Sequence, residues 1–129
     1  AYHYFEQHGK GHIAVISSIA GTKGLGSAPA YSATKRFQNT YIDALDQLAH
    51  MKKLNISFTD IRPGFVATPL LKDDKYPLLM HTSQVASQIV KAISRRKRVA
   101  IIDWRYQLIV FFWKLIPGWL WVRLPVRNQ

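Results

Sequence analysis

Short stretches of strand length alternate along the chain with longer segments in which apolar residues have helical spacing. The short stretches are 12–18, 55–62 and 98–103, and the first is a continuous apolar run, typical of a strand buried on both faces of a parallel sheet. The segments between them carry apolar residues at steps of three and four, as expected for one face of a helix. This order predicts an α/β fold, with a parallel sheet of about three strands joined by right-handed crossover helices.

Local signals predict where the two helices begin and what they bury. Ser27 is a suitable N-cap for the first helix, with Pro29 tolerated in the first turn, and the second helix begins at Thr82 or Ser83. The expected inward faces are Phe37, Tyr41, Leu45 and Leu48 in the first, and Val85, Ala86, Ile89, Val90 and Ile93 in the second. Residues 65–81 mix Pro, Asp, Lys and Leu, which predicts a long irregular loop of the kind that is usually functional or mobile.

The first residues, "AYHYFEQHGKG", are typical of the end of a helix, with Gly9 as its C-cap. They hold neither an initiator Met nor the basic, apolar and small-residue regions of a secretory signal. A cytoplasmic location is expected, with association with a membrane left open. We also expect the chain to be the C-terminal piece of a longer protein. Its 129 residues have the length of one domain, so we expect a single domain over residues 1–129, with 1–105 as its main part and 106–129 as a C-terminal segment.

Composition narrows the chemistry that is available. The chain has no cysteine, which excludes disulfides and thiolate metal sites. The histidines, at positions 3, 8, 12, 50 and 81, lack the spacing of a zinc site, so no metal is expected. The net charge of +11 comes mainly from residues 75–129, which carry ten Lys and Arg against one acidic residue. A basic half indicates attraction to nucleic acid, attraction to an anionic membrane surface, or a solvated face.

The C-terminal segment 106–129 is apolar, aromatic and basic at once. Its apolar stretch, from Tyr106 to Val122, is 17 residues long and is broken by a lysine and a Pro-Gly pair, so it is shorter than the roughly 20 residues of a spanning helix. An interfacial amphipathic segment, a lid over a lipophilic substrate pocket, and packing against the sheet or a partner subunit all stay open. Nucleic-acid binding is not expected, because the basic cluster at 95–98 lacks interleaved aromatic residues.

The stretch from Ser17 to Lys35 carries the residues with the clearest chemistry. Ligands of α/β folds bind at the carboxyl ends of the strands, and Ser18 ends the first strand. Tyr31 and Lys35 are four residues apart, so they share one face of the following helix. A free phenol titrates near pH 10, and a neighbouring ammonium favours its ionised form, which suits proton exchange with an alcohol or carbonyl oxygen. None of these groups accepts a hydride, so redox chemistry would need a cofactor.

Three motifs in order resemble those of the short-chain dehydrogenase/reductase family. They are "GHIAVISSIAG", then "YSATK" with Tyr31 thirteen residues after Ser18, then "IRPGFVATPL". The resemblance extends from the first residues to about Asp103. It implies a Rossmann-like domain that binds NAD or NADP and interconverts an alcohol with a ketone or aldehyde.

The resemblance also assigns roles to individual residues. Tyr31 matches the general acid/base, and Lys35 matches the residue that favours the phenolate and hydrogen-bonds the nicotinamide ribose. Ser18 matches the serine that holds the substrate oxygen. The segment that lines the nicotinamide is matched by Pro63, Gly64, Val66 and Thr68, and the loop after it resembles a substrate-binding lid.

Other features of the family are not found in the chain. Family members open with a Gly-rich phosphate-binding turn and carry a catalytic Asn, so the N-terminal strands of the sheet are expected to be missing. The Gly-rich stretch 21–26 follows the serine strand and is interpreted as the loop to the tyrosine helix. We therefore expect the isolated chain to be inactive. Homo-oligomers are expected as well, because family members form a four-helix dimer interface with the corresponding helix.

Overall fold

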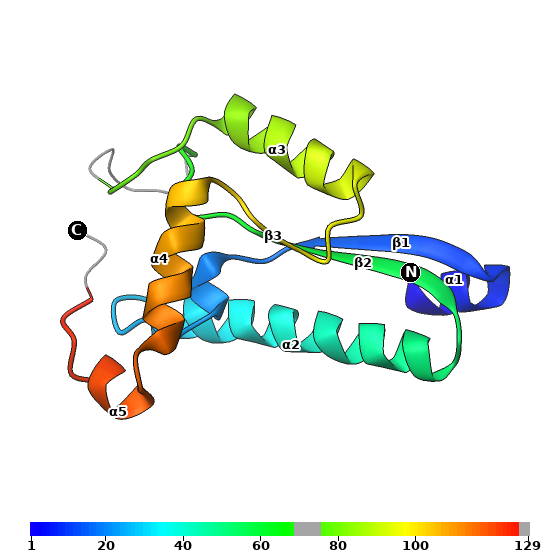
Figure 1. The fold of residues 1–129 in the computed structure, drawn as a ribbon, viewed down its shortest axis with the longest axis horizontal. Helices are drawn as coiled ribbons and strands as arrows, with labels where there is room; N and C mark the ends of the chain where they lie inside the picture. The colour runs from blue at the N-terminus through cyan, green and yellow to red at the C-terminus, as the bar shows by residue number, and fades with distance from the viewer. Residues whose placement is uncertain (69–75, 127–129) are drawn as a thin grey trace.

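The computed structural model of the protein describes residues 1–68 and 76–126. Its centre is a parallel sheet in the order β1, β2, β3, formed by β1 (Lys10–Ile16), β2 (Asn55–Arg62) and β3 (Val99–Ile101) (Figure 1). All of β1 pairs with β2, whereas β3 pairs only with the last three residues of β2. The predicted α/β fold with a three-stranded parallel sheet is confirmed.

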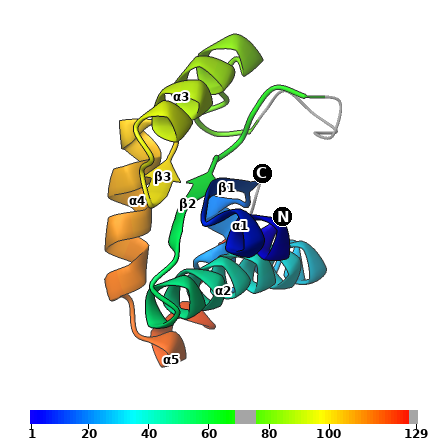
Figure 2. The same cartoon turned by 90° about the vertical axis from the view of Figure 1, so that its right-hand side faces the viewer.

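Two long helices cover opposite faces of the sheet. α2 (Pro29–Met51) joins β1 to β2, and α3 (Thr82–Ser94) lies between β2 and β3. Figure 1 and Figure 2 both show α2 on one side of the strands and α3 on the other. The parallel strands lie in the sheet in the same order as in the chain, and the two crossovers pass over opposite faces of it. The two crossovers therefore have opposite hands, so the expectation of right-handed crossovers is wrong for one of them. The long connection 63–81 gives the chain enough length to reach the second face.

The first helix and β1 meet at two glycines. α1 (Tyr2–His8) ends at Gly9, whose φ of 76° is left-handed, so the predicted C-cap is confirmed. Gly11 lets the helix fold back onto β1, since a Cβ there would lie 2.1 Å from the Phe5 ring. α1 therefore packs directly on the first strand.

Two clusters of buried apolar side chains hold the helices on the sheet. One cluster joins the sheet to α3 and α4 (Trp104–Leu115), and its buried members are Ile19, Ile61, Met80, Val85, Ile102, Tyr106 and Val110. The other joins the sheet to α1 and α2, and its buried members are Ile42, Ala49, Ile56 and Phe58. The sheet is therefore a middle layer with one core on each side.

β1 is only partly covered, contrary to the expectation that both of its faces are buried. Ile16 at its end is 56% exposed, whereas every residue of β2 from Phe58 to Arg62 is buried. The cause is position, since β2 lies between two strands and two helices, while β1 is an edge strand of the described sheet.

The buried face of α2 also differs from the predicted one. Phe37 and Tyr41 are exposed and stack on each other with ring centroids 5.7 Å apart, while Leu45 and Leu48 are half-buried. The buried residues of α2 are instead Ser32, Asn39, Ile42 and Ala49. A polar Asn39 replaces an apolar residue there because its amide donates to Ser17, directly after β1, and to Asp60 of β2.

In α3 the predicted inward face is confirmed in part. Val85 is buried, and Ile89 and Ile93 are half-buried against the core. Ala86 and Val90 are exposed, because they lie on a side of the helix that none of the described elements covers.

The C-terminal segment forms α4 and the short α5 (Gly118–Trp121). One face of α4 places Tyr106 in the core, so part of this segment packs against the sheet. α5 is tied to the loop after β1, because Trp121 Nε1 donates to Gly24 O and Lys23 Nζ donates to Ile116 O, each at 2.7 Å. Among the helices of the described residues, none is long and apolar enough to cross a bilayer.

Candidate active site

The carboxyl ends of β1 and β2 lie next to the start of α2 (Figure 1), and the candidate residues belong to the segments at this end of the sheet. β1 leads into Ser17, Ser18 and a turn of 3₁₀ helix, η1 (Ile19–Gly21). β2 leads into the segment Pro63–Thr68. Because the two strands are parallel and paired to their ends, both segments leave the sheet at the same edge.

Ser18 connects the ends of the two strands. Its Oγ accepts from Ala20 N–H at 3.1 Å, which caps η1, and donates to Pro63 O at 3.3 Å. Ile19 N–H donates to the same carbonyl at 3.1 Å. The hydroxyl proton of Ser18 is therefore held by a long bond, which a better-placed acceptor at this edge would replace.

Tyr31 and Lys35 lie on consecutive turns at the start of α2, as predicted. Lys35 Nζ sits 5.7 Å from the centre of the Tyr31 ring and donates to Ile16 O at 3.2 Å, so the ammonium is held at the end of β1. Tyr31 itself is 43% exposed. In the described part of the chain no hydrogen bond joins Ser18, Tyr31 and Lys35 directly. The fold thus brings the three residues to one edge of the sheet.

Tyr106 holds the segment that follows β2. Its hydroxyl accepts from Phe65 N–H at 3.1 Å and faces the carbonyls of Pro77 and Leu78 at 3.0 and 3.1 Å. Burial raises the pKa of the Tyr106 phenol, so the hydroxyl keeps its proton and its role as donor at neutral pH. Gly64 lies against the Tyr106 ring, where a Cβ would come within 2.3 Å of it, so a side chain does not fit.

The rest of this segment runs beside the chain that precedes α3. Val66 forms a parallel bridge with Met80, and Ala67 N–H donates to Met80 O at 2.9 Å. Thr68 is exposed. The expected lid begins after Thr68, and its residues 69–75 lie outside the described residues.

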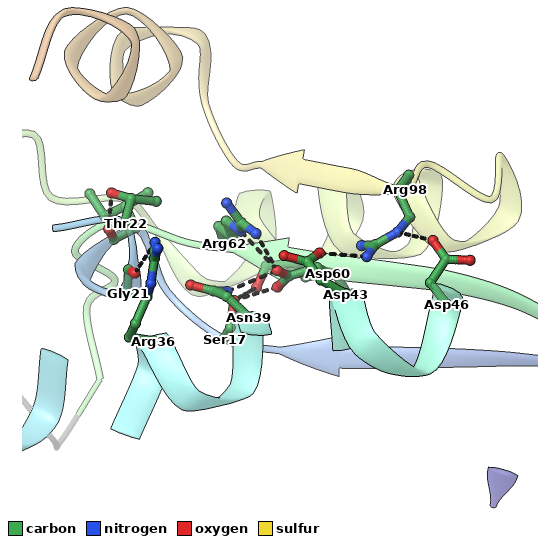
Figure 3. A network of polar contacts seen from close by, with 12 residues as sticks. Ser17, Gly21, Thr22, Arg36, Asn39, Asp43, Asp46, Asp60, Arg62 and Arg98 are labelled. Carbon is green, nitrogen blue, oxygen red and sulfur yellow. Dashed lines mark hydrogen bonds and ion pairs between the residues drawn. The ribbon is translucent and has the colours of Figure 1, made fainter. Parts of the chain in front are cut away.

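A buried polar network that no sequence motif indicated lies at this edge of the sheet (Figure 3). Asp60 is fully buried and accepts from Arg62 Nε at 2.8 Å and Nη2 at 2.6 Å, from Asn39 Nδ2 at 2.8 Å, and from Ser17 Oγ. Asn39 Nδ2 also donates to Ser17 Oγ at 2.8 Å. The buried carboxylate is thus both paired with a cation and hydrogen-bonded, which are the conditions under which buried charge is tolerated.

This network joins the three elements that carry the candidate residues. Ser17 directly precedes Ser18, and Asn39 lies one turn after Lys35 on α2. Asp60 lies on β2, just before the segment that begins at Pro63. The relative positions of the candidate residues therefore depend on this cluster. The signal for it in the sequence is the pair Asp60 and Arg62, two opposite charges two residues apart in an otherwise uncharged strand.

The glycine-rich loop 21–26 packs against α2. A Cβ on Gly21 would lie 2.2 Å from Asn39 Oδ1 and 2.7 Å from the backbone of Lys35, whereas Gly24 and Gly26 have open space. Gly21 therefore allows η1 to touch the helix beside Lys35.

Gly21→Ala is expected to lower the free energy of unfolding by about 1–3 kcal/mol, because the new methyl group meets helix backbone. Urea unfolding followed by circular dichroism measures the change. The matched control is Gly24→Ala, which has nothing within 4 Å of its Cβ and should leave stability equal or slightly higher. Equal effects of the two substitutions would show that close packing at Gly21 contributes nothing.

Comparison with known proteins places this site in a family. The sequence profile described as short chain dehydrogenase matches residues 1–77. An uncharacterised oxidoreductase of Myxococcus xanthus is 30% identical over 111 residues, which cover 84% of this chain and 43% of that protein. The sepiapterin reductase of Chlorobaculum tepidum is 29% identical over 99 residues, which cover 74% of this chain and 40% of that protein. The chain thus spans about two fifths of the length of these relatives.

The fold agrees with this match. A short chain dehydrogenase of Burkholderia cenocepacia, solved in complex with NADP, superposes with a TM-score of 0.74 at 16% identity. The superposition covers 92% of this chain and 48% of that one, and at this identity it shows a shared fold. Because the matched profile covers more than half of the residues, the chain belongs to the short-chain dehydrogenase/reductase family.

Proposed function

We propose that this chain is the proton-transfer half of an NAD(P)-dependent oxidoreductase that interconverts an alcohol with a ketone or aldehyde. One observation carries the proposal: the end of β1 and the first turns of α2, which bear Ser18, Tyr31 and Lys35, lie at the same edge of the sheet. Membership of the family supports a dinucleotide as the redox partner, since no group of the trio takes up a hydride.

The residues at this edge suit the nicotinamide end of a dinucleotide. Lys35 Nζ uses one N–H on Ile16 O, so two donors are free to bind the ribose hydroxyls. The nicotinamide would be lined by Pro63, Gly64, Val66 and Thr68, in the segment that Tyr106 holds. The cofactor, when bound, delivers or accepts the hydride at the substrate carbon. The loop 21–26 does not suit its phosphates, because Gly21 is packed against α2.

The chain's own residues would handle the proton. In carbonyl reduction Tyr31 donates its phenolic proton to the carbonyl oxygen, and in alcohol oxidation the phenolate takes the proton up. The ammonium of Lys35 lies beside this phenol, with Nζ 5.7 Å from the centre of the Tyr31 ring. Ser18 holds the same oxygen by exchanging its long bond to Pro63 O for a bond to the substrate.

The isolated chain is proposed to be inactive. Hydride transfer needs the cofactor fixed close to the substrate carbon, and this chain offers the nicotinamide side of the site. The relatives are more than twice as long as the segment that they share with it. The activity therefore belongs to a longer protein that contains this chain, with a small alcohol or carbonyl compound as substrate.

The test compares the 129-residue chain with a longer protein that contains it. Consumption of NADH and NADPH is followed with a panel of aldehydes and ketones, and turnover is expected from the longer protein only. Turnover by the isolated chain above its Tyr31→Phe variant would contradict its inactivity. A longer protein that neither binds NAD(P)H nor reduces any member of the panel would refute the proposed reaction.

A further inference from the structure

The outer face of α4 is an exposed apolar stripe. We call it the α4 stripe; it comprises Trp104, Leu108, Phe111, Phe112 and Leu115, at positions i, i+4, i+7, i+8 and i+11 of the helix. Phe111 and Phe112 are 59% and 62% exposed. Tyr106 and Val110 project from the other side of α4 into the core, so the stripe cannot turn inward without emptying that core.

α5, which follows α4 along the chain, also exposes a tryptophan. Trp119 is 64% exposed, while Trp121 on the same turn anchors α5 to Gly24. Figure 2 shows α4 on the β3 side of the sheet, with α5 following it. An exposed tryptophan therefore stands at the start of α4, Trp104, and another in α5, Trp119, and tryptophan is a residue enriched at membrane interfaces.

A basic groove borders the stripe. It lies between α3, β3 and α4, has a volume of about 630 Å³, and shares Phe111 with the stripe. Its charged lining residues are Lys91, Arg95, Lys97 and Lys114, and no carboxylate of the described residues lines it. Asp103, the one acidic residue from 76 to 126, is bound by Arg105 Nε and Nη2 at 3.0 and 2.8 Å. The groove is therefore positive with no acidic side chain to offset it.

We propose that the α4 stripe, α5 and the basic groove dock on the surface of a membrane that contains anionic phospholipids. The side chains of the stripe enter the boundary between headgroups and acyl chains, where aromatic and aliphatic side chains are favoured. The cations of the groove bind the phosphate headgroups. An apolar face combined with a basic patch provides the two signals that stable attachment to a bilayer surface requires.

Charge favours a lipid surface over a second copy of the chain. A two-fold dimer through this face would bring the basic groove against its own copy, and like charges across an interface oppose association. Single-stranded nucleic acid is a further anionic candidate, but such sites place aromatic residues within the basic groove for base stacking. Here the groove holds Phe111, while the rest of the stripe lies on the outer side of α4 and includes two leucines. An anionic bilayer fits both the stripe and the groove.

The test is sedimentation of the complete 129-residue chain with vesicles of phosphatidylcholine, with and without phosphatidylglycerol. Binding is expected to the anionic vesicles alone, and it should weaken as salt shortens the range of the charges. The double variant Phe111→Gln with Phe112→Gln is expected to lower the partition coefficient of the chain on anionic vesicles about tenfold or more. The double variant Lys97→Gln with Lys114→Gln is expected to lower it by the same factor. All four side chains are exposed, so the fold should persist, and circular dichroism checks this.

Phe37→Gln with Tyr41→Gln is the matched control, because these exposed aromatic residues lie on α2, and this variant should bind vesicles like the original chain. The proposal fails if the chain ignores anionic vesicles, or if the stripe variant binds them equally well. A dimer in gel filtration that only the stripe substitutions abolish, without vesicle binding, would assign the face to a second copy. Binding of labelled single-stranded DNA in place of vesicles would assign it to nucleic acid.

Discussion

Replacement of Tyr31 by phenylalanine in the longer protein is expected to lower turnover by about 10²–10⁴-fold, the usual contribution of a positioned acid or base. The substitution removes the group that would exchange a proton with the substrate oxygen, and it keeps the ring that Lys35 Nζ approaches at 5.7 Å. Because Tyr31 is 43% exposed, loss of its hydroxyl should leave α2 folded. The measurement is kcat from NAD(P)H consumption, with the KM for the cofactor expected to stay the same.

Tyr41→Phe is the matched control for this experiment. It makes the same change on the same helix, but the Tyr41 ring is exposed and stacks on Phe37, so kcat should not change. Lys35→Met is expected to lower kcat and also to weaken NAD(P)H binding, because it removes both the charge beside the phenol and the donors for the ribose. Full activity in Tyr31→Phe would remove Tyr31 from the mechanism, while family membership would stand.

Asp60→Asn is expected to lower the free energy of unfolding by about 3–5 kcal/mol, the range measured when one partner of a buried ion pair is removed. Asp60 is fully buried, and Arg62 beside it keeps its positive charge when the carboxylate is lost. The substitution also disturbs the bonds from Asn39 and Ser17. Urea unfolding of the 129-residue chain, followed by circular dichroism, gives the change.

Asp43→Asn is the control, because it removes the charge of an exposed carboxylate instead of a buried one. The Asp43 side chain is 62% exposed and binds Arg98 Nη2 at 2.6 Å, so its loss should change stability by less than about 1 kcal/mol. The double variant Asp60→Asn with Arg62→Gln should recover part of the loss, because it leaves no buried charge without a partner. If Asp60→Asn unfolds at the same urea concentration as Asp43→Asn, the buried pair does not stabilise the chain.

The order of elements was predictable because it depends on short-range periodicity. β1, β2 and β3 overlap the three predicted strands, and α2 and α3 overlap the two predicted helices. The C-cap at Gly9 likewise needs only the end of one helix and a residue that tolerates a positive φ. Such features are set by neighbours within a few positions along the chain.

The faces of the helices were less predictable. Hydropathy favours burial of Phe37 and Tyr41, yet both are exposed, and Asn39 between them is buried. Asn39 is stable there because it binds Ser17, 22 residues before it, and Asp60, 21 residues after it. A pattern within one helix contains no information about such partners. The positions of the candidate residues were more predictable than the faces of the helices, because each candidate residue lies beside a strand end or on a helical turn.

The sequence alone predicted an α/β chain in which Ser18, Tyr31, Lys35 and Pro63 reach one edge of the sheet. These predictions follow from spacing along single strands and helices. Three features became known only from the three-dimensional structure: Asp60 is buried with its partners, the two crossovers have opposite hands, and α4 buries one apolar face and exposes another. Each of these depends on which elements cover a given surface, and therefore on contacts between residues far apart in the chain.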